Sequence, residues 1–335
     1  MRNSEIYRRT LKFALMRMLC TIVGIVFLIA LPIVGFVAFA GMGEVAAVIA
    51  AIVGLILGIV VMVVIGRYAG YLFRAGQIAM IAQGVAEGQL PADAYAAGKQ
   101  AVKERFGTAS VYFALMTITR AISNEITTGL NAVAGAVGGA TNNNNPAAAA
   151  ASIASAIISI VLEYLNYCSL GWVFLHRDQN AFKSTCDGAV IYFQNWKTLL
   201  KNAGKVLALT AVSLLVIGGA FFGLFYLILG SIGPLTSVLA DLDAAATLDD
   251  GSPVPAGTCL IILCVIVALV FWGGVHGAFI EPYILVSVMR RYVEAGYANP
   301  PKVDLYGKLA GMSKGFRKAL DKAGDNARGG EGASA

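Results

Sequence analysis

Two apolar stretches decide the fold: residues 111–137 (VYFALMTITRAISNEITTGLNAVAGAV) and residues 147–175 (AAAAASIASAIISIVLEYLNYCSLGWVFL). Each is long enough to cross a hydrocarbon core of about 30 Å as a helix. Each also carries polar residues at three- and four-residue spacing, which places them on one helix face. The two polar stripes consist of Thr117, Arg120, Asn124, Thr127, Thr128 and Asn131, and of Ser152, Ser155, Ser159, Glu163 and Asn166.

The two stripes carry opposite charges at matching depth. Arg120 lies 22 residues before Asn142, near the expected turn, and Glu163 lies 21 residues after it. Antiparallel helices rising about 1.5 Å per residue would bring the two charges to the same level. Because a lone charge inside a membrane is costly, we expect Arg120 and Glu163 to face each other inside a helical bundle. Whether this pair is structural or part of a solute site stays open.

Composition and hydropathy place the whole chain in a membrane. It has 335 residues, of which 58% are hydrophobic and only 13% charged, and its mean hydropathy is +0.74. Soluble domains have about 25% charged residues. The sequence therefore predicts an all-α polytopic membrane protein, with one membrane domain over residues 1–322 and a disordered tail over residues 323–335. Six spans are expected, at about residues 18–40, 45–65, 111–137, 147–175, 206–229 and 258–288.

The distribution of basic residues gives the expected topology. If the chain crosses the membrane six times, 24 of its 25 Lys and Arg residues lie on the same side of the membrane as the N-terminus. The exception, Arg120, lies in a span. By the positive-inside rule, both termini are expected in the cytoplasm of a multi-pass inner-membrane protein. The net charge of +6 is thus explained by topology and does not indicate nucleic-acid binding. A cleaved signal peptide ending at Ala38-Phe39-Ala40 is the alternative for the first span.

Several segments are expected to lie at the cytoplasmic membrane interface as amphipathic helices. They are residues 67–107, 176–205 and 302–322, and a small soluble insert is the alternative for the first. Within the spans, Gly54/Gly58, Gly219/Gly223 and Gly273/Gly277 have the small-residue spacing that lets membrane helices approach closely.

No enzyme signature occurs in the chain. There is no phosphate-binding G-x-x-x-x-G-K-[ST], no H-E-x-x-H and no G-x-S-x-G motif. The five cysteines form no CxxC pair and no metal-like spacing with the two histidines. We therefore expect neither enzymatic activity nor a metal or cofactor.

The candidate site residues are the polar and ionisable residues inside the predicted spans. Glu281 lies near the inner interface, and His276 is expected at a depth similar to that of Arg120 and Glu163. Histidine is the side chain suited to proton exchange at physiological pH, so a proton-linked role and a satisfied core histidine are both considered for His276. The predicted pore-lining or solute-binding residues are Arg120, Asn124, Thr128, Asn131, Ser155, Ser159, Glu163, Asn166, His276 and Glu281.

The C-terminal half is similar to the last third of choline-transporter-like proteins. The similarity rests on Leu162-Glu163-Tyr164-Leu165, on the amphipathic segment 187–201, and on Val275-His276-Gly277-Ala278-Phe279 before a cytoplasmic segment. The chain departs from that family in having six expected spans instead of ten, and in lacking its large cysteine-bearing outer loop. The whole chain also resembles prokaryotic polytopic membrane proteins of no assigned function, especially over residues 103–107 and 192–197.

Two function classes follow from these patterns. The first is a transporter or channel for a small polar or cationic solute, which the resemblance also implies. The second is a non-transporting membrane scaffold or complex subunit, whose basic cytoplasmic helices bind anionic lipid headgroups or a partner protein. The expected partners are the bilayer and these ligands, and the sequence leaves a homo-oligomer open.

Overall fold

The computed structural model describes residues 1–106, 164–195, 199, 203–245 and 254–307. These residues form helices, and no β-strand occurs among them. Within these residues, four helices are long and apolar enough to cross a membrane: Asn3–Met42, Val45–Gly66, Val206–Gly230 and Thr258–Ala298. They coincide with four of the six predicted spans. The predicted span 111–137 and most of 147–175 lie outside the described residues, as do most of the segment 302–322 and the tail 323–335.

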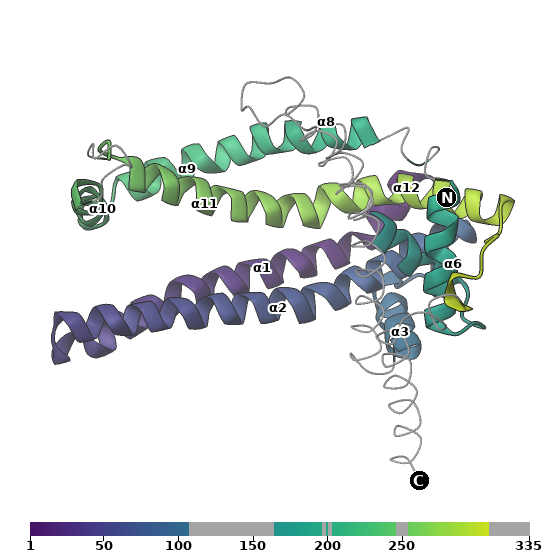
Figure 1. The fold of residues 1–335 in the computed structure, drawn as a ribbon, viewed down its shortest axis with the longest axis horizontal. Coiled ribbons are helices and arrows are strands. Elements are labelled where there is room, and N and C mark those ends of the chain that lie inside the picture. The colour runs from purple at the N-terminus through teal and green to yellow at the C-terminus, as the bar shows by residue number, and fades with distance from the viewer. Residues whose placement is uncertain (107–163, 196–198, 200–202, 246–253, 308–335) are drawn as a thin grey trace, which may run out of the picture. The chain divides into compact units, whose positions relative to one another are not determined.

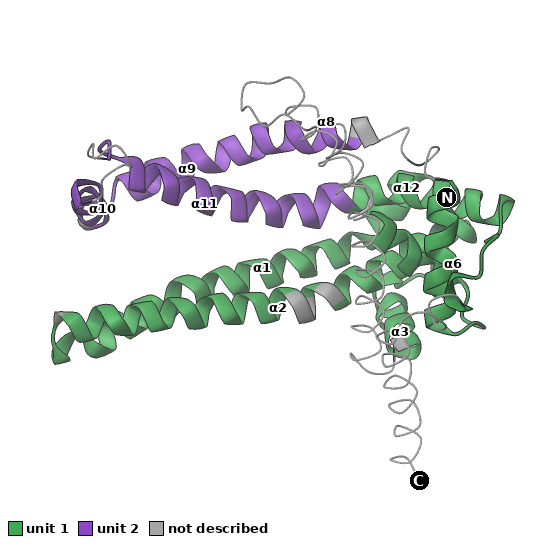
Figure 2. Cartoon of the chain, in the orientation of Figure 1, with its two compact units in different colours: residues 1–204, 282–335 green, residues 205–281 purple. Residues whose placement is uncertain are grey.

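The chain forms two compact units (Figure 2). Unit 1 comprises residues 1–204 and 282–335, and unit 2 comprises residues 205–281. The long helix that begins at Thr258 passes from unit 2 into unit 1 at Pro282.

Unit 1 is built on an antiparallel helical hairpin (Figure 1). It consists of α1 (Asn3–Phe39), a 3₁₀ turn (Ala40–Met42) and α2 (Glu44–Ala86). Gly43 closes the turn with a φ of 111°, a conformation that glycine adopts without strain.

Glycines let the two helices of this hairpin touch through their backbones. A Cβ atom on Gly54 would lie 2.4 Å from the carbonyl oxygen of Leu31, and one on Gly58 would lie 2.9 Å from Cα of Leu28. The close approach predicted from the Gly54/Gly58 spacing is therefore confirmed.

For the two later glycine pairs this prediction stays untested. Among the described residues, added Cβ atoms at Gly219, Gly223 and Gly273 would meet no atom within 4 Å. The predicted spans 111–137 and 147–163 lie outside the described residues.

Four shorter pieces surround the end of this hairpin that carries the N-terminus. They are α3 (Ala94–Phe106), helical residues 164–175, α6 (Ala181–Gln194) and α12 (Glu281–Ala298). Their core contains Tyr292, which is fully buried and donates a hydrogen bond of 3.0 Å to the carbonyl oxygen of Gly188. Close packing is again made by glycine, since a Cβ on Gly296 would lie 2.6 Å from the Trp172 ring.

Hydrogen bonds join the four segments that six spans would put on one side of the membrane, which are residues 1–17, 66–110, 176–205 and 289–335. Arg290 binds Asn3, Arg9 binds the Leu90 carbonyl, and Arg105 binds the carbonyl oxygens of residues 176, 177 and 179. With the link from Tyr292 to Gly188, every one of these segments contacts another. This arrangement agrees with their expected common location.

Two of the three segments expected at the membrane interface contribute to the core of unit 1. α2 continues without a break from the second span to Ala86, and residues 75–82 are all buried. In α6, nine of the fourteen residues are buried, so the helix is covered on most sides. Tertiary packing therefore covers much of the apolar surface of these two segments, and their interfacial location stays a prediction.

Unit 2 is a second helical hairpin. α8 (Ala203–Ser213), a π-helical segment (Leu214–Gly218) and α9 (Gly219–Gly230) form one side, and α11 (Thr258–Val275) with a second π-helical segment (His276–Ile280) forms the other. Phe225 and Phe271 pack across it with ring centroids 4.9 Å apart. The connection between the two sides contains α10 (Gly233–Ala245), a helix that lies between two predicted spans.

Candidate functional site

The structure describes three of the ten predicted site residues. Asn166 lies in unit 1, whereas His276 and Glu281 lie in unit 2. The other seven fall outside the described residues, and so does the expected Arg120–Glu163 pair. These are Arg120, Asn124, Thr128, Asn131, Ser155, Ser159 and Glu163.

His276 belongs to a polar cluster between the two sides of unit 2. Its Nε2 shares a hydrogen bond of 3.3 Å with Oγ1 of Thr210, and the tautomer of the ring decides which atom donates. The Trp272 ring packs on the imidazole with centroids 5.1 Å apart. His276 is thus held by a polar and an aromatic partner from two different helices.

Ser213 extends this cluster by one turn along α8. Its hydroxyl accepts a hydrogen bond of 3.2 Å from Nε1 of Trp272 and donates one of 2.8 Å to the carbonyl oxygen of Thr210. Ser213 is buried, and Thr210 and His276 are half-buried. The four side chains form a connected polar path across two spans that are otherwise apolar.

A π-helical segment begins at this level on each side of the hairpin. One starts directly after Ser213, and the other starts at His276 itself. Single π-turns inside α-helices are rare, and they often occur at functional sites. Their pairing around one polar cluster makes this the candidate site of unit 2.

Glu281 and Asn166 mark two further polar positions. Glu281 is only 6% exposed and directly follows the second π-helical segment. The side-chain oxygen of Asn166 is buried and has no hydrogen-bond partner among the described residues. A buried polar atom of this kind is costly unless a group outside the described part satisfies it.

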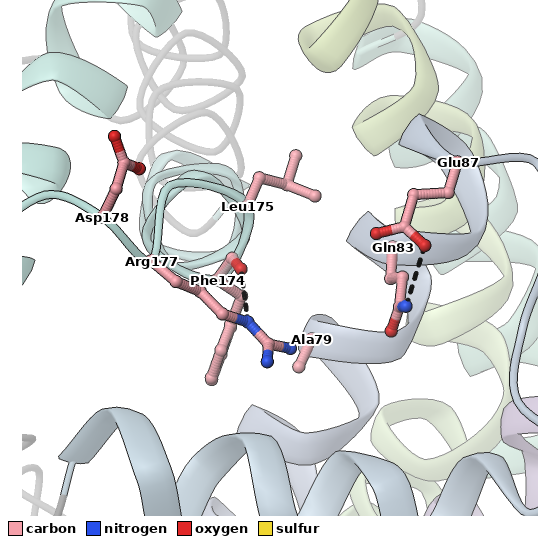
Figure 3. A pocket seen from close by; sticks show the side chains of 7 residues that line it. All are labelled: Ala79, Gln83, Glu87, Phe174, Leu175, Arg177 and Asp178. Carbon is pink, nitrogen blue, oxygen red and sulfur yellow. Dashed lines mark hydrogen bonds between the residues drawn. The ribbon is translucent and has the colours of Figure 1, made fainter.

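Unit 1 contains a separate cavity of about 400 Å³ (Figure 3). Its floor includes the buried side chains of Ala79 and Phe174, and Gln83 and Glu87 continue the wall along the same face of α2. Leu175, Arg177 and Asp178 complete the lining.

Internal contacts already use much of the polar chemistry around this cavity. Gln83 donates a hydrogen bond of 2.9 Å to Glu87, and Arg177 donates one of 3.3 Å to the Phe174 carbonyl oxygen. Arg177 also lies 3.6 Å from Glu104, with both side chains about half exposed. The cavity is large enough for a small molecule. The guanidinium group of Arg177 in its lining, however, already contacts the Phe174 carbonyl oxygen and Glu104.

Comparison with known proteins adds no family to this picture. No protein-family model matches the chain, and comparisons with curated proteins and with solved structures found no significant similarity. The resemblances described from short motifs stay predictions.

Sequence reasoning identified His276 but missed its partners. Thr210 and Ser213 have the three-residue spacing of one helix face in an otherwise apolar span, which is the signal used for the two polar stripes. Trp272 lies four residues before His276, so the two side chains share a face. The register that brings these two faces together is visible only in the tertiary structure.

Proposed function

We propose that the chain is a membrane transporter or channel for a small polar or cationic solute. The observation that carries this proposal is the hydrogen bond between Thr210 and His276, at a level where both helices of unit 2 adopt π-helical turns. Polar groups inside membrane spans are costly and commonly line solute or proton paths. A titratable imidazole in this position suits a pathway that moves a cation or couples to a proton.

The proposed path also includes the predicted polar stripes of residues 111–137 and 147–175. Glu163 would supply the carboxylate for a cation, with Arg120 as its charge partner. Asn166 supports this extension, because its buried side-chain oxygen has no described partner and lies one helical turn from Glu163.

The proposed orientation places both termini in the cytoplasm of a six-span inner-membrane protein. Support comes from the contacts among the basic segments, which include those from Arg290 to Asn3 and from Arg105 to Gln179. All of these segments would lie on the side that retains positive charge.

Solute uptake into proteoliposomes tests the proposal. The solutes are labelled choline, suggested by the motif resemblance, and several other small cations. The wild type is compared with Glu163→Gln, His276→Gln and Thr210→Val. We expect uptake by the wild type and its loss in Glu163→Gln, with a clear reduction in the two unit 2 variants.

Thr236→Val serves as the matched control for Thr210→Val. Thr236 is half-buried on α10, and its hydroxyl donates a hydrogen bond to the Gly233 carbonyl oxygen of its own helix, so uptake should be unchanged. Wild-type protein that is well folded yet moves none of these solutes, or variants that transport like the control, would contradict the proposal.

Hydration along the second polar stripe gives an independent test. Cysteines placed at Ser152, Ser155 and Ser159 should react with water-soluble maleimides along the whole stripe, because a solute path must contain water. Labelling restricted to the membrane ends would instead favour a dry, structural bundle.

The second candidate function is a non-transporting scaffold or complex subunit. It is favoured by the extensive packing of the basic segments in unit 1, where Arg105 and Arg290 are used for internal hydrogen bonds. Such a rigid basic layer would suit the binding of anionic lipid or a partner protein.

A further inference from the structure

Two lysines flank one tyrosine where α1 and α3 meet. The Nζ atom of Lys12 lies 4.6 Å from the centroid of the Tyr95 ring, and that of Lys99 lies 5.7 Å from it. The two ammonium groups are therefore within about 10 Å of each other. Both lysines are exposed, and neither forms an ion pair with another described residue.

The Tyr95 ring near both lysines is held in place. Tyr95 packs on Phe13 with centroids 4.9 Å apart and on Phe73 with centroids 6.3 Å apart. The nearby carboxylate of Asp93 accepts hydrogen bonds from the amides of Tyr95 and Ala96, so it caps α3. Two positive charges thus sit beside a fixed aromatic surface, and the neighbouring carboxylate is engaged by the helix.

Lys12 also stands at the end of an exposed apolar strip on α1. Leu15, Leu19 and Val26 follow it at helical spacing on the same face. Their side chains are 53%, 50% and 57% exposed. An acyl chain could lie along this strip over the full length of one lipid leaflet.

The position of the lysine pair relative to the bilayer agrees with a lipid ligand. Lys12 lies six residues before Met18, where the apolar run of the first span begins. Six residues correspond to about 9 Å of helix, and the headgroup layer outside the hydrocarbon core is about 5–8 Å thick. The flexible lysine stem places its ammonium group at the level of the lipid phosphates.

We propose that Lys12, Lys99 and Tyr95 form a binding site for one anionic phospholipid. The two ammonium groups bind its phosphate, the tyrosine ring borders the headgroup, and an acyl chain covers Leu15, Leu19 and Val26. The site lies entirely within unit 1 and does not depend on whether the chain transports a solute.

Native mass spectrometry of the full-length protein in detergent tests this site. The protein is titrated with phosphatidylglycerol, with phosphatidylcholine of the same acyl chains, and with glycerol 3-phosphate. The double variant Lys12→Gln/Lys99→Gln is compared with Arg291→Gln/Lys302→Gln. The control removes the same charge from two exposed positions in unit 1.

We expect the wild type and the control variant to retain phosphatidylglycerol in preference to phosphatidylcholine. The Lys12/Lys99 variant should bind it more weakly, by about fivefold for each lysine removed. Circular dichroism and gel filtration check that both variants are folded. Equal phosphatidylglycerol binding by the two variants would overturn the proposal. Glycerol 3-phosphate bound as tightly as the lipid would also overturn it, because the apolar strip would then contribute nothing.

Discussion

Arg105 donates a hydrogen bond of 2.7 Å from Nη2 to the carbonyl oxygen of Gln179. The same guanidinium binds the carbonyl oxygens of His176 and Arg177 at 3.0 and 3.1 Å. These carbonyls follow the end of the helical residues 164–175, where main-chain acceptors lack helical partners. Arg105 lies just before the predicted hairpin of residues 111–175, and the three carbonyls lie just after it. The arginine therefore joins the two ends of this hairpin.

Replacing this arginine should destabilise unit 1. Arg105→Gln removes charge-assisted hydrogen bonds to three carbonyls, and we expect a loss of roughly 2 kcal/mol or more in the free energy of unfolding. Denaturation by SDS, followed by circular dichroism, measures the change. Lys103→Gln is the control, since Lys103 is exposed on the same helix. Equal stability of the two variants would show that the arginine contacts contribute nothing.

The α1–α2 hairpin should be sensitive to a single methyl group. In Gly54→Ala the new Cβ would clash with the Leu31 carbonyl oxygen, so the helices must separate, at a cost of about 1–3 kcal/mol. Gly223→Ala is the matched control, because its Cβ would meet no neighbour among the described residues and alanine favours a helix. Thermal unfolding in detergent should show a lower midpoint only for the first variant, and equal midpoints would argue against tight packing at Gly54.

Asp187 should make stability depend on pH. Burial raises the pKa of this carboxyl group above its ordinary value. The positive charge of Lys183 lowers the pKa in part, and the negative charge of Asp304 raises it further. The folded state thus binds the proton more tightly than the unfolded state. This stabilising contribution is complete below the unfolded pKa of about 3.9 and is lost as pH rises through the folded pKa.

Asp187→Asn should therefore raise the unfolding midpoint at pH 7, because the amide avoids burying a charge. The gain should shrink as the pH is lowered towards about 4, where the wild-type carboxyl is protonated as well. Glu294→Gln, at an exposed position on α12, is the control and should show no such trend. A midpoint difference that is independent of pH would contradict the burial argument.

Asp243 should hold the start of α11. Its side chain is only 2% exposed and accepts hydrogen bonds of 2.8 and 2.9 Å from the amides of Gly257 and Cys259. The Cys259 thiol and amide and the Gly257 amide bind the carboxylate and lower its pKa. The lowered pKa means that the contribution is present at neutral pH and is lost as pH falls through the folded value.

In Asp243→Ala, the amides at the start of α11 should exchange with deuterium faster than in the wild type at neutral pH. Asp241→Ala changes an exposed carboxylate two residues away on the same helix and should leave this exchange unchanged. Unaltered exchange in Asp243→Ala would mean that the helix start is held by other contacts.

The sequence by itself determined the class of protein and four of its spans. Length and hydropathy alone show that a run of apolar residues could cross a bilayer, so Met18–Ala40 and the later runs could be identified without knowledge of their neighbours. The Gly54/Gly58 contact was also predictable, because the turn at Gly43 forces the two adjacent spans together.

Only the tertiary structure decided which polar residues meet and which amphipathic stripes face protein. His276 was identifiable as a polar group in a span. Its hydrogen bond to Thr210, which lies 66 residues earlier in the sequence, depends on the register between the two helices. The amphipathic pattern of residues 67–107 was visible as well, yet the complete burial of residues 75–82 in unit 1 was not. Periodicity states which face of a helix is apolar, whereas long-range packing decides whether lipid, water or another helix covers that face.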